Sequence, residues 1–130
     1  MVKEHEISEE MLNLFKQVAK DYCGKFGLTD WDVRISHLKR NTGDMATLTY
    51  AHAARAANID IDIAYDVDED EVRTSALHEV LHLVLTDMRE AYSQYLDADV
   101  VEREHERFES VEHAAINRII NAFKDGRNDK

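Results

Sequence analysis

Residues 72–87 read VRTSALHEVLHLVLTD, and this stretch decides the fold. Its apolar side chains recur at helical spacing and form one wide stripe, made of Leu77, Val80, Leu81, Val84 and Leu85. An acidic cluster at residues 66–71 precedes it, as expected where carboxylates cap a helix and complement its dipole. A calcium-binding loop would need a glycine and a distal glutamate that this cluster lacks. We therefore predict an amphipathic helix that buries one face.

Upstream of this helix, the sequence predicts one further helix and three strands. The helix covers residues 8–26, where Ser8 is suited to the N-cap and apolar residues again recur at helical spacing. Apolar and polar residues then alternate in three short segments, which is typical of half-buried strands: residues 31–36, 47–50 and 58–64.

The third predicted strand, residues 58–64, has a distinctive acidic side. Asp60 and Asp62 alternate with isoleucines, so we expect the Asp face in solvent. Charged residues along one side suit an edge strand, because they discourage unwanted pairing with other chains. The sequence therefore predicts that residues 58–64 form an edge strand of the sheet.

Downstream, residues 98–124 are predicted as one long, charged, amphipathic helix. Residues 88–97 are less regular, and the tail at residues 125–130 is expected to fray. The chain shows no internal repeat and its 130 residues suit one modest core. We therefore predict a single α+β domain over residues 1–130.

Composition and charge narrow the classes of function. The formal net charge of −11 disfavours non-specific binding to nucleic acid, because such a chain repels phosphate backbones. No apolar run is long enough for a membrane span, and residues 1–10 lack the features of a signal peptide. The single cysteine, Cys23, excludes a zinc ribbon and an internal disulfide, and it favours a reducing, cytoplasmic compartment.

The motif His78-Glu79-Val80-Leu81-His82 has the spacing H-E-x-x-H. Two histidines four residues apart lie on the same face of a helix, so both imidazoles can reach one ion. Glu79 lies beside that pair, where it can take a proton from a metal-activated water. Zinc suits this chemistry because it lowers the pKa of bound water and polarises a substrate carbonyl. The motif therefore predicts zinc held by His78 and His82, with Glu79 as the catalytic base.

A catalytic zinc usually has a third protein ligand. Leu85 and Met88 stand where the longer motif with a third histidine would need glycine and histidine, so that motif is excluded. The last predicted helix offers glutamates instead, and Glu112 differs from the others because it shares the inward apolar face. A buried carboxylate needs a cation partner. We predict Glu112 as the third ligand, with Glu109 and His113 as the alternatives.

Several other residues are weaker candidates. His105 and His113 could support the metal ligands or act as transition-state donors, although an ordinary surface position is the simpler interpretation. Tyr92 and Tyr95 could supply a donor to an oxyanion, with packing as the default. Cys23 is interpreted as a buried structural cysteine.

These residues resemble the zincin metallopeptidases of the gluzincin type, and in particular minimal gluzincins such as small metallopeptidases of bacteria and phages. The resemblance covers residues 30–124, and its matching stretches are residues 58–64, 74–85 and 112–116. It implies a zincin-like fold: an N-terminal helix, a small three-stranded sheet with an antiparallel edge strand, the H-E-x-x-H helix and a long C-terminal helix.

The same resemblance implies roles for individual residues. His78, His82 and Glu112 would hold zinc, and Glu79 would act as general base and then as general acid. A peptide or protein substrate would lie along the edge strand at residues 58–64. Larger gluzincins carry an aspartate four residues after the ligand glutamate, whereas this chain has Ile116. With Glu109 as the ligand, the equivalent position would be His113.

Three hypotheses follow for the function. The first is a cytoplasmic zinc-dependent peptidase, supported by the motif beside a candidate edge strand. The second is a non-catalytic zinc-binding module with a regulatory or interaction role, which the small size and acidic surface favour. The third is hydrolysis of a non-peptide bond, because zinc-activated water is not selective in itself.

Overall fold

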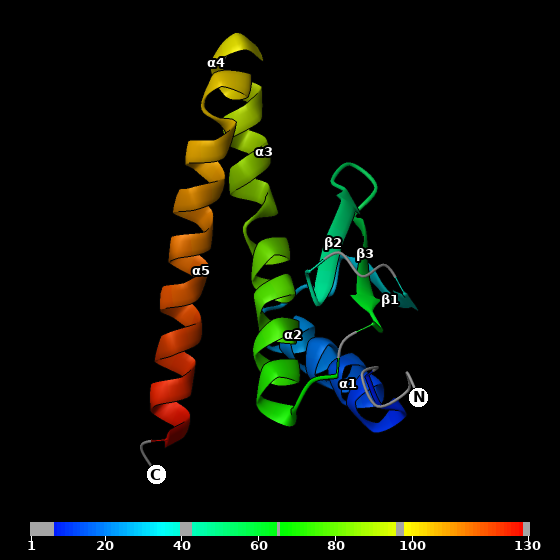
Figure 1. Ribbon diagram of the computed structural model, residues 1–130. Coiled ribbons are helices and arrows are strands. Elements are labelled where there is room, and N and C mark those ends of the chain that lie inside the picture. The colour runs from blue at the N-terminus through cyan, green and yellow to red at the C-terminus, as the bar shows by residue number, and fades with distance from the viewer. Residues whose placement is uncertain (1–6, 40–42, 65, 96–97, 129–130) are drawn as a thin grey trace.

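A computed structural model describes residues 7–39, 43–64, 66–95 and 98–128, with the side chains of residues 95 and 125–128 outside the description. Figure 1 shows helices on one side of a small sheet, with α2 (Glu69–Val84) lying between the sheet and the long α5 (His105–Asn128). In chain order the elements are α1 (Glu9–Lys25), β1 (Asp32–Leu38), β2 (Ala46–Ala51), β3 (Ala56–Asp62), α2 (Glu69–Val84), α3 (Thr86–Tyr95), α4 (Ala98–Arg103) and α5 (His105–Asn128). The predicted α+β class is confirmed.

The sheet has the strand order β1-β3-β2. β3 pairs in parallel with β1 and in antiparallel with β2, so it is the central strand. The prediction that residues 58–64 form an edge strand is therefore wrong. Alternation of apolar and polar residues reports which face of a strand is buried, but not which strands lie beside it. The antiparallel edge strand next to α2 is β2.

The expected solvent-exposed Asp face of β3 is also corrected. Asp62 is 3% exposed, and its Oδ1 accepts a hydrogen bond from the Ala64 amide at 3.0 Å. Asp60 is half-buried and accepts a hydrogen bond from the Ser36 hydroxyl of β1. A central strand has neighbours on both sides, so its polar side chains meet partners there and not only water.

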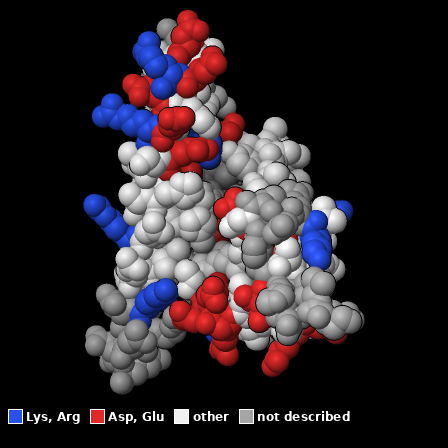
Figure 2. All heavy atoms as spheres, in the orientation of Figure 1, with Lys and Arg blue, Asp and Glu red and all other residues white. Residues whose placement is uncertain are grey.

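The helix starts follow local capping rules. The Ser8 side chain accepts a hydrogen bond from the Met11 amide at the start of α1. At the start of α2, Asp68 and Glu71 form a reciprocal capping box, which confirms the capping role predicted for the acidic cluster. Figure 2 shows acidic groups at the lower end of the molecule, where α2 begins in Figure 1.

Three predicted boundaries downstream of α2 are wrong. Residues expected to be irregular form α3 instead. The expected helix over residues 98–124 is divided at Glu104 into α4 and α5, and α5 continues to Asn128 where a frayed tail was expected. Figure 1 shows α3, α4 and the first half of α5 as a hairpin that projects beyond the sheet. None of the described helices combines the length and apolar character that spanning a membrane requires.

Two apolar clusters fix the position of α2. On one side it joins α1 and the inner face of the sheet, through buried residues that include Phe15, Val18, Ile59, Ile61, Val72 and Val80. On the other side Leu77 and Leu81 pack against Ile116 and Ile120 of α5. Both clusters involve α2. They therefore fix the orientation of α2 relative to the sheet and to α5.

A group of polar contacts ties α3 to the turn between β2 and β3. His52 Nε2 lies 2.7 Å from Asp87 Oδ1, and Arg55 Nη1 donates to the same oxygen at 2.9 Å. Arg55 has a φ of 52° and its guanidinium lies 5.2 Å from the centroid of the Trp31 ring. Three residues further along α3, Glu90 accepts a hydrogen bond from the Tyr50 hydroxyl. These contacts hold α3 against the edge strand β2.

The Asp87 contacts predict a pH-dependent contribution to stability. Hydrogen bonds from His52 and Arg55 lower the pKa of Asp87 below its ordinary value. Since the folded-state pKa lies below the unfolded-state value, the stabilisation is present above about pH 4 and is lost as the pH falls through the folded pKa. We expect Asp87→Asn to lower the free energy of unfolding at pH 7 by about 1 kcal/mol or less, because Asp87 is exposed.

Urea unfolding followed by the fluorescence of Trp31, the single tryptophan, measures this effect. The gap between wild type and Asp87→Asn should shrink between pH 7 and a pH below the lowered folded-state pKa of Asp87, where both side chains are uncharged. Asp21→Asn on α1 is the control, and an Asp87→Asn gap of the same size at both pH values would contradict the prediction.

Candidate metal centre

His78 and His82 lie on one face of α2, as the motif predicts. Both side chains are half-buried, and their Nε2 atoms are 3.1 Å apart. Two imidazole nitrogens that share a tetrahedral zinc ion at about 2.0–2.1 Å are about 3.3 Å apart. The spacing of this pair therefore fits two ligands of one ion.

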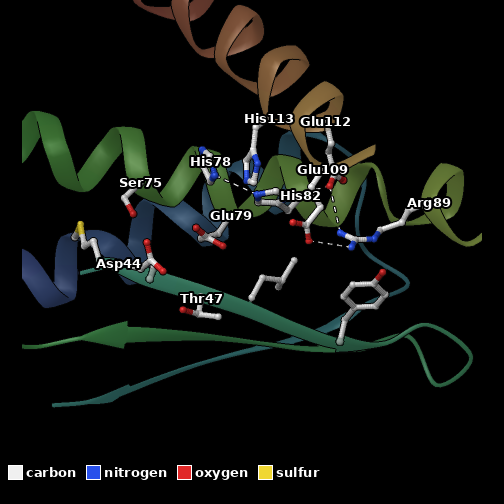
Figure 3. A pocket seen from close by; sticks show the side chains of 14 residues that line it. Asp44, Thr47, Ser75, His78, Glu79, His82, Arg89, Glu109, Glu112 and His113 are labelled. Carbon is white, nitrogen blue, oxygen red and sulfur yellow. Dashed lines mark hydrogen bonds and ion pairs between the residues drawn. The ribbon is translucent and has the colours of Figure 1, made fainter. Parts of the chain in front are cut away.

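A third imidazole comes from α5. His113 has its ring centroid 5.5 Å from that of His78 and 4.9 Å from that of His82. The ligand nitrogens of the three histidines all lie within 4.8 Å of one another. Figure 3 shows His113 descending from α5 towards the pair on α2. The three histidines, named the histidine cluster below, form a group that could hold a metal ion.

Glu112, the predicted third ligand, lies on the other side of His82. Its side chain is buried, which confirms that it shares the inward face of α5. Its Oε1 is 3.6 Å from His82 Nδ1, whereas His82 Nε2 faces the cluster. The same oxygen accepts a hydrogen bond from Arg89 Nη1 at 3.3 Å. The structure thus brings His113 into the cluster and places Glu112 beside the other ring nitrogen of His82, Nδ1, which faces away from the cluster.

Glu109, the first alternative, lies further out. Its Oε1 is 3.4 Å from Arg89 Nη2 and 3.1 Å from His105 Nε2. His105 is thereby engaged by the side chain one turn away on its own helix. Of the two alternatives, the histidine His113 is the one that reaches His78 and His82.

Glu79 is buried in the wall of the same pocket. Its side chain is 7% exposed, and burial raises its pKa to about 7, with the charge of Asp44 adding to the effect and that of His82 opposing it. In Figure 3 the Glu79 carboxylate points into the space between α2 and β2, below the histidine cluster. A carboxylate with a pKa near 7 can both accept and return a proton at neutral pH.

Burial and neighbouring charges set the other protonation states. Burial lowers the pKa of His78 to about 4, and the positive charges of His82 and His113 act in the same direction. Its imidazole is therefore neutral at pH 7, the form that binds metals. Burial alone would raise the pKa of Glu112, but the hydrogen bond and charge of His82, with the charge of Arg89, lower it.

The pocket around these groups has a volume of about 480 Å³. One wall is the edge strand β2 with the residues just before it, and the other walls are α2, α3 and α5. Figure 3 shows Asp44 and Ser75 towards one end and Arg89 with Glu109 towards the other. Tyr50 and Leu48 of β2 also line it. The pocket therefore lies between β2 and the histidine cluster.

Other predicted candidates lie away from this pocket. The Tyr92 ring packs at 4.5 Å from that of Phe108, which confirms packing as its role, and the side chain of Tyr95 lies outside the described residues. Cys23 lies on α1 and is half-buried, less than was predicted, and burial raises the pKa of its thiol.

Arg89 and Tyr50 are pocket residues that sequence reasoning missed. Arg89 lies seven residues after His82, which places the two on one face if the helix continues, and α3 follows α2 after a single residue. That spacing was a usable signal, but residues 88–97 were interpreted as irregular. Tyr50 gave no signal, because nothing in a short alternating strand shows which end faces a site.

Comparison of the chain with protein-family models, with curated proteins and with solved structures finds no match.

Proposed function

We propose that the protein is a zinc-dependent metallopeptidase in which His78, His82 and His113 hold the metal and Glu79 is the general base. The observation that carries this proposal is the convergence of three imidazoles from α2 and α5 within 4.8 Å, beside a buried glutamate in one pocket. Three protein ligands with an adjacent open pocket are typical of catalytic zinc. We extend the same proposal to a zincin-like relationship and to a cytoplasmic location.

The donor set supports zinc. Neutral imidazole nitrogens bind zinc, copper, iron and nickel better than they bind magnesium or calcium, which prefer oxygen. His82 has Glu112 at its second ring nitrogen, an arrangement that orients a metal-bound histidine and raises its basicity. When bound, zinc would activate water and polarise the bond to be cleaved.

The residues of the pocket supply the proton transfers. Glu79 would accept a proton from the attacking water at its carboxylate, which faces the pocket. The same carboxyl group would then deliver that proton to the leaving amine. A pKa of about 7 fits both directions of transfer at neutral pH, because neither protonation state is strongly favoured.

The edge strand β2 supports an extended peptide as the substrate. Among the described residues β2 pairs with β3 alone, so its other edge is unpaired there, and residues of β2 line the pocket. An extended peptide could pair with that edge by main-chain hydrogen bonds and pass under Glu79. This proposal replaces residues 58–64 with residues 46–51 as the substrate strand.

Zinc titration of the purified protein tests the ligand set. We expect one zinc ion per wild-type chain, no measurable site in His78→Ala, and a larger loss of affinity in His113→Ala than in Glu112→Ala. A ligand forms a coordination bond to the metal. Loss of a residue that only hydrogen-bonds to a ligand typically lowers metal affinity by about 10–100-fold. His105→Ala is the matched control, because it removes an exposed histidine from the same helix.

Abolished binding in Glu112→Ala together with intact binding in His113→Ala would reverse this assignment. It would restore Glu112 as the third ligand.

Glu79→Gln tests the mechanism. The amide keeps the shape of the side chain but cannot act as a base, so we expect zinc to be retained and peptide hydrolysis to fall by roughly 10²–10⁴-fold. Cleavage of a fluorogenic peptide library, with zinc content measured in parallel, provides the readout. Glu102→Gln, on the exposed side of α4, is the control.

Full turnover in Glu79→Gln would disprove the role of Glu79. A wild-type protein that holds zinc but cleaves no peptide in the library would instead favour the non-catalytic zinc-binding module.

A further inference from the structure

Arg89 is the permanently charged cation among the described residues that line the pocket. It extends from α3, and its side chain is 26% exposed. Residues before and after Arg89 in the sequence hold this part of α3 in place. Asp87 contacts His52 in the β2–β3 turn, and Glu90 accepts a hydrogen bond from Tyr50. Arg89 is thus presented to the pocket by a helix that is tied to the sheet.

The guanidinium of Arg89 contacts two carboxylates of α5. Nη1 is 3.3 Å from Glu112 Oε1, and Nη2 is 3.4 Å from Glu109 Oε1. The guanidinium carbon of Arg89 lies over the Phe108 ring, 5.8 Å from its centroid. Figure 3 shows the contacts of Arg89 with Glu109 and Glu112 at the end of the pocket next to His82. The rigid fork of an arginine suits such a contact with two carboxylates better than a lysine does.

The guanidinium of Arg89 is a fixed positive charge in the same pocket as the proposed metal site. By Coulomb repulsion alone, Arg89 would weaken the binding of a divalent ion in the histidine cluster. Glu112 provides the reason for this charge, because it is a buried carboxylate one residue before His113, and its Oε1 already lies 3.6 Å from a ring nitrogen of His82. A carboxylate in that position can compete for zinc as a ligand.

The contacts of Glu112 Oε1 show how Arg89 acts on it. That oxygen lies between Arg89 Nη1 and His82 Nδ1, at 3.3 Å and 3.6 Å. We propose that Arg89 is a positioning residue of the metal centre: it holds Glu112 at His82 Nδ1, so that Glu112 orients a ligand and leaves the third ligand position to His113. This inference rests on the proposed metal-binding function.

The proposal and simple charge repulsion predict opposite signs. If Arg89 were only a nearby cation, Arg89→Met would strengthen zinc binding. If Arg89 acts by positioning Glu112, the same change should weaken zinc binding by about tenfold or more, as loss of a ligand's partner typically does. In a Glu112→Ala background there is no carboxylate to position, so adding Arg89→Met should cause no further loss.

The experiment measures zinc affinity by competition with a chromophoric chelator for wild type, Arg89→Met, Glu112→Ala and the double variant. Arg73→Met is the matched control, because Arg73 is also ion-paired with a glutamate but lies near the start of α2. Arg89→Lys should recover part of the affinity, since it keeps one charge contact with Glu112. The visible spectrum of the Co²⁺-substituted proteins adds a second readout, and Arg89→Met should alter it only while Glu112 is present.

Zinc affinity in Arg89→Met equal to or tighter than that of wild type would overturn the proposal. So would an equal loss from Arg89→Met in the Glu112→Ala background, because Arg89 would then act by another route. Absence of zinc binding in the wild type, or full binding in His78→Ala, would instead refute the proposed function itself.

Discussion

Leu77 and Leu81 of α2 pack against Ile116 and Ile120 of α5, and the rest of the site depends on this contact. His78 and His82 each follow one of these leucines, and His113 precedes Ile116 by one helical turn. The apolar packing therefore sets the distance between the two histidines of α2 and the one of α5. A change in the rotation of α5 about its axis would remove His113 from the cluster.

The same packing creates two buried carboxylates with opposite properties. Glu79 is buried without an arginine or lysine contact among the described residues, so its pKa is raised to about 7. Glu112 is buried beside His82 and Arg89, and its pKa is lowered. Divergent environments of this kind separate a proton-transferring group from a permanent anion. The two glutamates are therefore assigned different roles, although both belong to the predicted site.

Much of the fold was predictable because local patterns specify it. The capping box at Asp68 and Glu71, the stripe on α2 and the three short strands follow from residues close in sequence. The position of β3 in the centre of the sheet did not follow, because strand neighbours are set by tertiary pairing and not by alternation. Asp62 was expected in solvent for the same reason.

The site divides in a similar way. His78, Glu79 and His82 could be predicted because one helical turn brings them together regardless of the rest of the chain. Glu112 is predicted in preference to His113, but local spacing cannot decide between the two, since neighbouring residues on a helix point about 100° apart and only the rotation of α5 against α2 selects one. Arg89 lies seven residues after His82, and this spacing indicates a shared face only if the helix continues through the near-continuous junction of α2 and α3.

The central claim is that His78, His82 and His113 share one metal ion. A crystal structure of the zinc-loaded protein, with anomalous diffraction recorded on both sides of the zinc edge, tests it most directly. The account predicts one anomalous peak about 2.0–2.1 Å from a nitrogen of each of the three histidines, with Glu112 still at His82 Nδ1. A peak coordinated by Glu112 in place of His113, or no peak at the histidine cluster, would contradict it.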